Sequence, residues 1–215
     1  MRTARIVVLT VVVALVLSSI VRLFLFQTFL VPSVSMDPTL AVGERVVVSK
    51  FAAHDGNITR GDVIVFRDPG GWLPDEPTEA RSAVEQFLSR VGVLPEDTGP
   101  DLVKRIIGVG GDRVECCTAD GHLRLNGHVL VEAYLDAEVG SAQVFFNEVV
   151  PQGSYFVAGD NRGRSAGSRY HIAQGTWAVP HDLVVGKVIA VAWPFSQRRV
   201  IEGSAELATL PTASP

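Results

Sequence analysis

The chain begins with a nearly continuous apolar run and then alternates between short apolar stretches and turns. Residues 6–21 contain only three polar side chains, and a second apolar run, 23–31, follows Arg22. The 16 residues of the first run are fewer than the roughly 20 that span a bilayer core. An arginine near a helix end can extend its charge to the headgroups, so the span can continue past Arg22. We therefore predict a transmembrane anchor over residues 6–27.

The charges around this run predict its orientation. Arg2 and Arg5 precede it and few basic residues follow closely, so the positive-inside rule places residues 1–5 in the cytoplasm. The alternative is a cleaved secretory signal. We favour an uncleaved anchor because no Ala-x-Ala-like site follows the apolar core. Residues 23–31 are either the end of the helix or a segment lying in the outer interface.

The rest of the chain predicts strands, because its short apolar runs are rich in β-branched residues and are separated by turns. The expected strands are 45–49, 63–66, 102–109, 113–117, 122–125, 129–131, 143–146, 155–158 and 184–192. Asp120-Gly121 and Asn126-Gly127 are hairpin-type turn signals. The predicted fold is mostly β, with an N-terminal transmembrane helix, a coiled sheet or partial barrel, and an extended β-ribbon at 113–150.

The predicted domain, 28–200, is interrupted by one segment of different composition. Residues 68–100 are rich in proline and contain a helical apolar stripe within 78–91. We interpret them as an insertion, either a surface elaboration or a substrate lid, and favour the former. Residues 201–215 are polar and contain proline, and we predict that they are disordered.

Charge and cysteine content exclude some functions. The 215-residue chain has a net charge of −4 with mixed signs, and no basic patch indicates a nucleic-acid partner. Cys116 and Cys117 are adjacent, and we leave open whether they form a disulfide or remain thiols. The chain has no Cys/His spacing typical of zinc sites, and we expect no metal.

Candidate chemistry lies in three segments. Ser33 and Ser35 lie in 32–40, just beyond the anchor, Lys104 lies within the apolar strand 102–109, and Ser165 lies in 159–169. A serine hydroxyl needs a base before it becomes a good nucleophile, and none of the five histidines lies in a recognisable triad motif. Lysine can replace histidine if burial lowers its pKa.

Strand geometry supports a buried environment for Lys104. Alternate residues of a strand share a face, so Leu102, Lys104 and Ile106 should lie together. An amine among apolar neighbours would be desolvated. The alternative is a lysine at the edge of the strand whose amine extends into solvent.

In this order behind an anchor, the three segments resemble bacterial type I signal peptidase, a family of membrane-bound Ser-Lys serine proteases. The resemblance implies that Ser35 is the nucleophile and Lys104 the general base. The backbone N–H of Ser35 and the hydroxyl of Ser33 would form the oxyanion hole, and Ser165 would orient the lysine. Gly159, Asp160, Asn161 and Arg169 match residues that support the site.

The resemblance also implies the substrates and the location. Signal peptides of secreted preproteins would be cut after small residues at −1 and −3, without a cofactor. The partners would include membrane lipid and the export machinery, and the location would be the cytoplasmic membrane. Substrate pockets would be lined by Val31, Pro32, Met36, Leu40, Val46, Leu102, Val103, Val157 and Ala166.

One position departs from the family pattern. Arg169 corresponds to an arginine that normally pairs with an aspartate two residues earlier, and here that residue is Gly167. We expect either that Asp160 pairs with Arg169 instead or that the loop is looser. The alternative function is accordingly a catalytically weakened relative that binds signal peptides.

Overall fold

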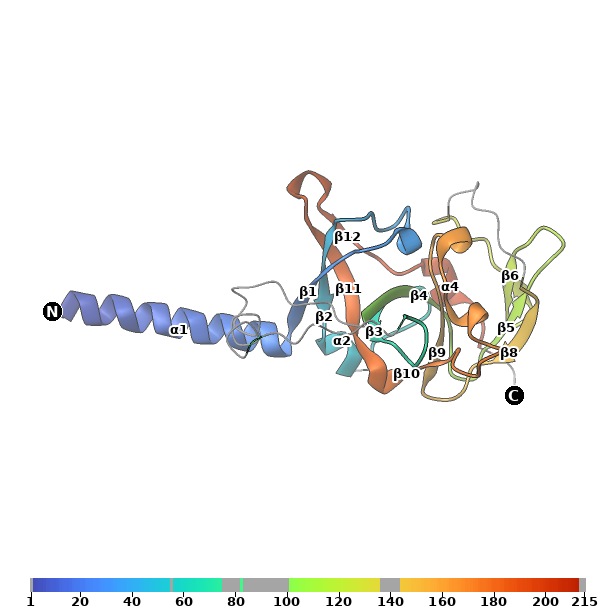
Figure 1. The fold of residues 1–215 in the computed structure, drawn as a ribbon, viewed down its shortest axis with the longest axis horizontal. Helices are drawn as coiled ribbons and strands as arrows, with labels where there is room; N and C mark the ends of the chain where they lie inside the picture. The colour runs from blue at the N-terminus through green and yellow to red at the C-terminus, as the bar shows by residue number, and fades with distance from the viewer. Residues whose placement is uncertain (1, 55, 75–81, 83–100, 136–143, 213–215) are drawn as a thin grey trace.

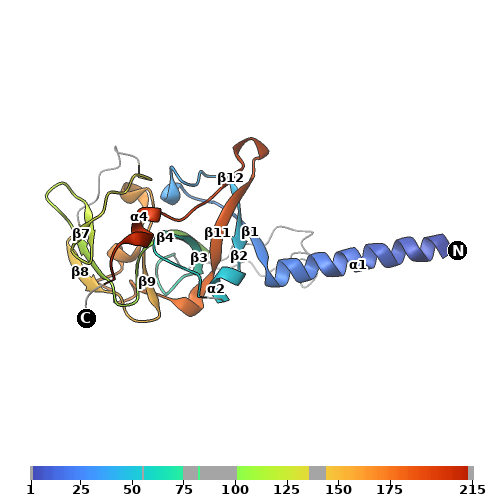
Figure 2. The same cartoon turned by 180° about the vertical axis from the view of Figure 1, so that it is seen from behind.

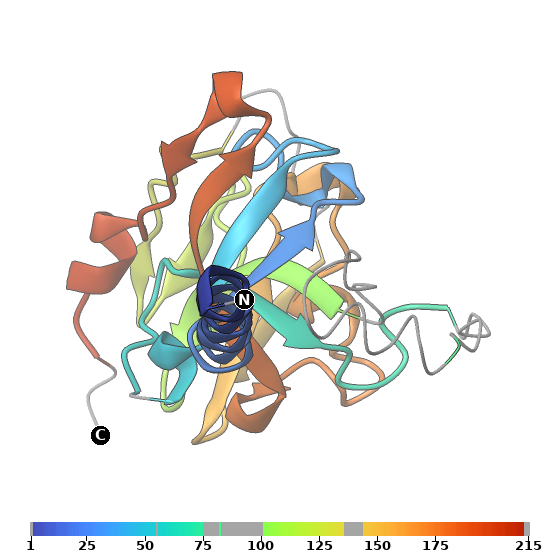
Figure 3. The same cartoon turned by 90° about the vertical axis from the view of Figure 1, so that its left-hand side faces the viewer.

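A helix projects from one side of a β-rich body (Figure 1). The computed structural model describes residues 2–54, 56–74, 82, 101–135 and 144–212. Helix α1 runs from Arg2 to Phe24 and extends away from the sheets in the view from behind (Figure 2). Figure 3 looks along this helix from its N-terminus toward the sheets. Within the described part of the chain, no helix combines the length and apolar character needed to cross a membrane.

The end of α1 differs from the predicted boundary. The helix stops at Phe24, and β1 (Phe26–Leu30) pairs antiparallel with β2 (Arg45–Ser49). Phe29 lies opposite Val46 and is 2% exposed. The helix therefore ends before the predicted boundary at residue 27, because Phe26–Leu30 pairs with β2 and Phe29 is buried in the core of the sheet. The interfacial placement of residues 23–31 stays a prediction.

The main sheet is antiparallel and open. Its order is β1-β2-β11-β3-β4-β9-β10, with β12 paired to β11. The further strands are β3 (Val63–Arg67), β4 (Asp101–Val109), β9 (Ser154–Ala158), β10 (Val179–Pro180), β11 (Val184–Trp193) and β12 (Arg199–Val200). The short helix α2 (Phe51–His54) follows β2. This arrangement confirms a mostly β fold, and the order has free ends at β1 and β10, so the barrel is not closed.

A second sheet fills the segment predicted to be a ribbon and lies at the end of the body opposite α1 (Figure 1). Its order is β7-β6-β5-β8. Its strands are β5 (Arg113–Cys116), β6 (Leu123–Leu125), β7 (His128–Val129) and β8 (Phe146–Val149). Asn126 and Gly127, both with positive φ, form the turn between β6 and β7, as the Asn-Gly signal predicts.

An apolar core joins the two sheets. Phe146 of the ribbon stacks on Phe156 of β9 with ring centroids 5.2 Å apart, and Leu125 and Ile107 are fully buried in the same cluster. Such aromatic and aliphatic burial is the main source of stability between packed layers. The ribbon is therefore fixed against β4 and β9.

The C-terminal segment differs from its prediction. Residues 201–212 are ordered rather than disordered and include helix α4 (Ala205–Thr209), whose Leu207 is 1% exposed. Arg60 donates to the carbonyl of Leu210 at 2.6 Å. The burial of Leu207 and the hydrogen bond from Arg60 hold this segment in place, although its polar composition predicted disorder. The predicted helix at 78–91 lies outside the described residues, apart from Ser82.

Candidate active site

The first serine segment forms a tight turn between β1 and β2. Ser35 lies in the 3-10 helix η1 (Val34–Met36) and is 9% exposed. Leu40 N–H donates to the Met36 carbonyl at 2.8 Å, and Met36 and Leu40 are buried in the core beneath. Buried anchors on this loop hold the Ser35 hydroxyl in place, and the Ser33 hydroxyl donates to it at 3.1 Å.

Lys104 reaches Ser35 from β4. Its Nζ lies 2.9 Å from Ser35 Oγ, and the residue is 3% exposed. Lys104 pairs in register with Ile64, which is fully buried in the cluster that includes Ile106 and the adjoining Leu102. Leu102 and Ile106 lie on the same face of β4 as Lys104 and contribute to this apolar cluster.

This environment changes the acidity of the lysine. Burial lowers the pKa of Lys104 to about 8, although the negative charge of Asp160 opposes the shift. A fraction of about one tenth of such a lysine is neutral at pH 7. Lys104 can therefore accept a proton from Ser35 under ordinary conditions, which an exposed lysine cannot do.

A glycine turn brings the third segment against the serine. The Asn161 N–H donates to the Ser35 carbonyl at 3.1 Å. A Cβ at Gly159 would lie 2.0 Å from Ser165 Oγ and 2.3 Å from the Ser35 carbonyl oxygen, so only glycine fits between them. Ser165 Oγ is buried and has no hydrogen-bond partner among the described residues, so the expected bond to Lys104 is not formed.

Asp160 ties the loops of the site together. Its fully buried carboxylate accepts two hydrogen bonds from Arg105, at 2.9 and 2.7 Å, and one from Thr39 Oγ1 at 2.5 Å. Arg105 also donates to the Gly61 carbonyl at 2.7 Å. One carboxylate thus connects the loop of Ser35 to the strand of Lys104.

Comparison with known proteins identifies the family. A family model described as "Signal peptidase, peptidase S26" matches residues 4–193. The chain belongs to this signal peptidase family.

The relatives agree with this assignment. A probable signal peptidase I of Mycobacterium leprae is 36% identical over 86% of this chain and 75% of its own length. Signal peptidase I of Mycobacterium tuberculosis is 37% identical over 88% of this chain and 72% of its own. A signal peptidase I structure from Enterococcus faecalis V583 matches at a TM-score of 0.41 and 28% identity, covering 61% of this chain and 96% of that one. That structural likeness is too weak to support an argument about the fold.

The family's arginine–aspartate pair is replaced here by other contacts. Asp160 binds Arg105, so the expectation that it pairs with Arg169 is wrong. Arg169 instead donates to the Arg162 carbonyl and lies over the Tyr170 ring at 4.8 Å. A Cβ at Gly167 would lie 2.8 Å from the Val157 carbonyl oxygen, so the backbone here is packed for glycine and has no room for aspartate without movement.

The residues predicted to line substrate pockets divide by exposure. Pro32 and Ala166 are exposed and Leu102 and Val103 are half-buried, so these four are accessible to a substrate. The others are at most 2% exposed and belong to the core: Val31, Met36, Leu40, Val46 and Val157. They lie in the core beneath the site, and their contact with substrate stays a prediction.

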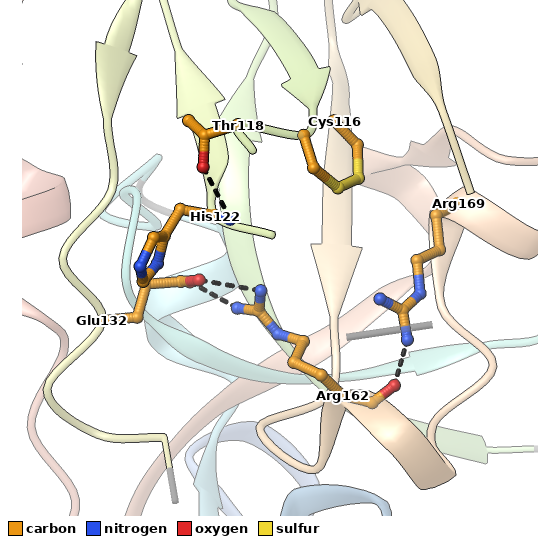
Figure 4. The surroundings of a disulfide bond; sticks show 7 residues. Cys116, Thr118, His122, Glu132, Arg162 and Arg169 are labelled. Atoms are coloured by element: carbon orange, nitrogen blue, oxygen red, sulfur yellow. Dashed lines mark hydrogen bonds and ion pairs between the residues drawn. A yellow bond between two sulfur atoms is a disulfide. The ribbon is translucent and has the colours of Figure 1, made fainter. Parts of the chain in front are cut away.

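Several buried polar residues escaped the sequence reasoning. Arg162 is 5% exposed and forms an ion pair with Glu132 of the ribbon (Figure 4). His171 is buried, and its ring stacks on Trp72 at 4.4 Å. A charged residue beside a Gly-Asp-Asn turn was the available signal for Arg162, but its partner lies 30 residues away.

Cys116 and Cys117 form a disulfide.

Proposed function

We propose that this signal peptidase, a serine endopeptidase, cuts signal peptides from exported preproteins with Ser35 as nucleophile and Lys104 as general base. The observation that carries the proposal is the 2.9 Å approach of Lys104 Nζ to Ser35 Oγ in a buried, apolar setting. A serine and a desolvated lysine within hydrogen-bond reach are the two groups that acyl transfer requires.

The steps follow from these two atoms. Neutral Lys104 takes the proton of Ser35 as Oγ attacks the scissile carbonyl carbon. The tetrahedral intermediate collapses, the C–N bond breaks, and the protonated lysine gives its proton to the leaving amine. Lys104 then takes a proton from a water molecule, which attacks the ester carbonyl, and returns it to Ser35 as the signal peptide leaves.

The developing negative charge on the carbonyl oxygen needs donors. We assign this role to the Ser35 N–H and the Ser33 hydroxyl, which already lies 3.1 Å from Ser35 Oγ. Each such donor contributes about 3–4 kcal/mol to transition-state stabilisation. Ser165, buried beside Gly159, would complete the site by bonding Lys104 once substrate is bound.

We also propose that the predicted anchor, which in the structure ends with α1 at Phe24, holds the enzyme in the cytoplasmic membrane, with the sheets on the extracytoplasmic side near membrane lipid and the export machinery. The proposal rests on the apolar sequence and on the exposure of Ile6, Leu9 and Val13 along α1, at 64%, 64% and 48%. Resistance of the full chain to extraction by alkaline carbonate tests it, and release into the soluble fraction would contradict it.

Cleavage of a preprotein with alanine at −1 and −3 tests the function. Wild-type protein in detergent should cut after the −1 alanine, and Ser35→Ala should abolish cleavage and labelling by a serine-directed acylating probe. Wild-type activity in Ser35→Ala would refute the assignment of the nucleophile. The dyad geometry gives no specific support to the alternative of a non-catalytic relative that binds signal peptides, so we propose no second function.

A further inference from the structure

An ion pair joins the ribbon to the catalytic loop. The Arg162 guanidinium donates to both carboxylate oxygens of Glu132, one of them at 2.8 Å. Both side chains are nearly inaccessible, at 6% and 5% exposure. The Tyr134 hydroxyl donates to the same carboxylate. Figure 4 shows Glu132 and Arg162 approaching from these two parts of the chain.

The pair connects directly to the backbone of the active site. Arg162 Nε donates to the Gly159 carbonyl at 3.1 Å. Ser165 and the Ser35 carbonyl both pack closely against Gly159. One residue on, the Asp160 carboxylate binds Arg105. The orientation of Arg162 therefore sets the position of the turn that contacts Ser35.

Tyr134 provides a second link between ribbon and site. The Arg105 guanidinium lies 4.1 Å from the centroid of the Tyr134 ring, a distance typical of a cation–π contact. Arg105 is the neighbour of Lys104 in β4. The segment after β7 thus contacts both cations that hold the site, Arg162 through Glu132 and Arg105 through Tyr134.

We propose that Glu132 is a positioning residue for catalysis, which holds the Gly159–Asn161 turn against Ser35 through Arg162, with Tyr134 as its auxiliary. This inference rests on the proposed roles of Ser35 and Lys104. It assigns the ribbon a part in the reaction, namely fixing the geometry of a loop that belongs to the other sheet.

The charge balance explains why the carboxylate is needed. Burial alone would lower the pKa of Arg162, but the charge of Glu132 and the hydrogen bonds to it raise that pKa above its usual value. Neutral glutamine at position 132 would leave a buried cation without its counter-charge, which is strongly unfavourable. The turn would then shift to give Arg162 access to water and would lose its contact with Ser35.

Steady-state cleavage by the full chain in detergent tests the proposal. Glu132→Gln should lower kcat by about 10- to 100-fold, the effect expected of a catalytic group displaced by up to 1 Å. KM should change less than about twofold, because Glu132 is not among the residues predicted to line the substrate pockets. Glu148→Gln, on β8 of the ribbon, is the matched control and should keep wild-type kcat.

The results for these variants distinguish a positioning role of Glu132 from a purely structural one. They also distinguish failure of this proposal from failure of the proposed Ser35–Lys104 dyad. A Glu132→Gln enzyme that is fully folded at the assay temperature and keeps wild-type kcat overturns the inference, while activity in Ser35→Ala overturns the dyad itself. If Glu132→Gln does not fold, Tyr134→Phe replaces it, since it keeps both charges and removes only the hydroxyl that orients the carboxylate. Tyr134→Phe should lower kcat by about two- to fivefold, and an unchanged kcat would equally overturn the proposal.

Discussion

Strand β4 buries a basic residue on each of its two faces, and the two side chains bind different groups. Lys104 and Arg105 are adjacent and are each 3% exposed. Lys104 meets the hydroxyl of Ser35, whereas Arg105 meets the carboxylate of Asp160. Lys104 and Arg105 are therefore equally inaccessible to solvent, but their hydrogen-bond partners differ.

The side chain and its partner together decide whether the buried cation keeps its charge. Desolvation lowers the pKa of Lys104 to about 8, although the charge of Asp160 opposes the shift. Burial also acts to lower the pKa of Arg105, but the hydrogen bonds and charge of Asp160 outweigh it and raise that pKa above the usual value. Because arginine is in any case a stronger base than lysine, Arg105 keeps its charge and binds a carboxylate, whereas Lys104 beside the Ser35 hydroxyl can lose its proton.

Replacing Lys104, the proposed general base, should have the largest effect. Lys104→Met should lower kcat by about 10²- to 10⁴-fold, the usual contribution of a general base. Its folding stability should stay the same or rise, because the substitution removes a desolvated amine and fills the same space. Cleavage assays and urea unfolding measure the two quantities, and near-normal cleavage would refute the role of Lys104.

Replacing Arg105, on the other face of β4, should lower the stability of the fold, which replacing Lys104 should not. Arg105→Met should lower the free energy of unfolding by about 3–5 kcal/mol, because it leaves the buried Asp160 carboxylate without its cation. Urea unfolding of Arg105→Met and Lys104→Met under identical conditions makes the comparison direct. Equal stability of the two variants would show that Asp160 does not distinguish the two faces.

The smallest effect concerns the pH dependence of kcat/KM. Only neutral Lys104 can accept the Ser35 proton, so kcat/KM should rise about tenfold per pH unit at low pH and level off above about 8. Asp160→Asn should move this midpoint to lower pH, because the carboxylate it removes favours the protonated lysine. A midpoint that moves upward in Asp160→Asn would contradict this account of the electrostatics.

Local patterns predicted the strands well and their ends less well. Strands β2, β3 and β4 appear where the β-branched runs predict them, although only β2 alternates between buried and more exposed residues, whereas β3 and most of β4 are continuously buried. Phe26 and Gln27 were assigned to the anchor because the apolar residues here continue those of α1, and only pairing with β2 makes Phe26–Leu30 a strand. The tail beyond Ile201 looked disordered because its few apolar residues, such as Leu207, reveal their burial only in contact with the ribbon.

The sequence by itself predicted which residues would carry the proposed chemistry, because the segments with Ser35, Lys104 and Ser165 resemble a known family in content and in order. The tertiary structure alone decided their partners. It placed Asp160 on Arg105 rather than Arg169, buried Arg162 and supplied Glu132 from the segment after β7. The physical reason is that a buried charge must find a counter-charge in space, and no local pattern records which distant segment provides it.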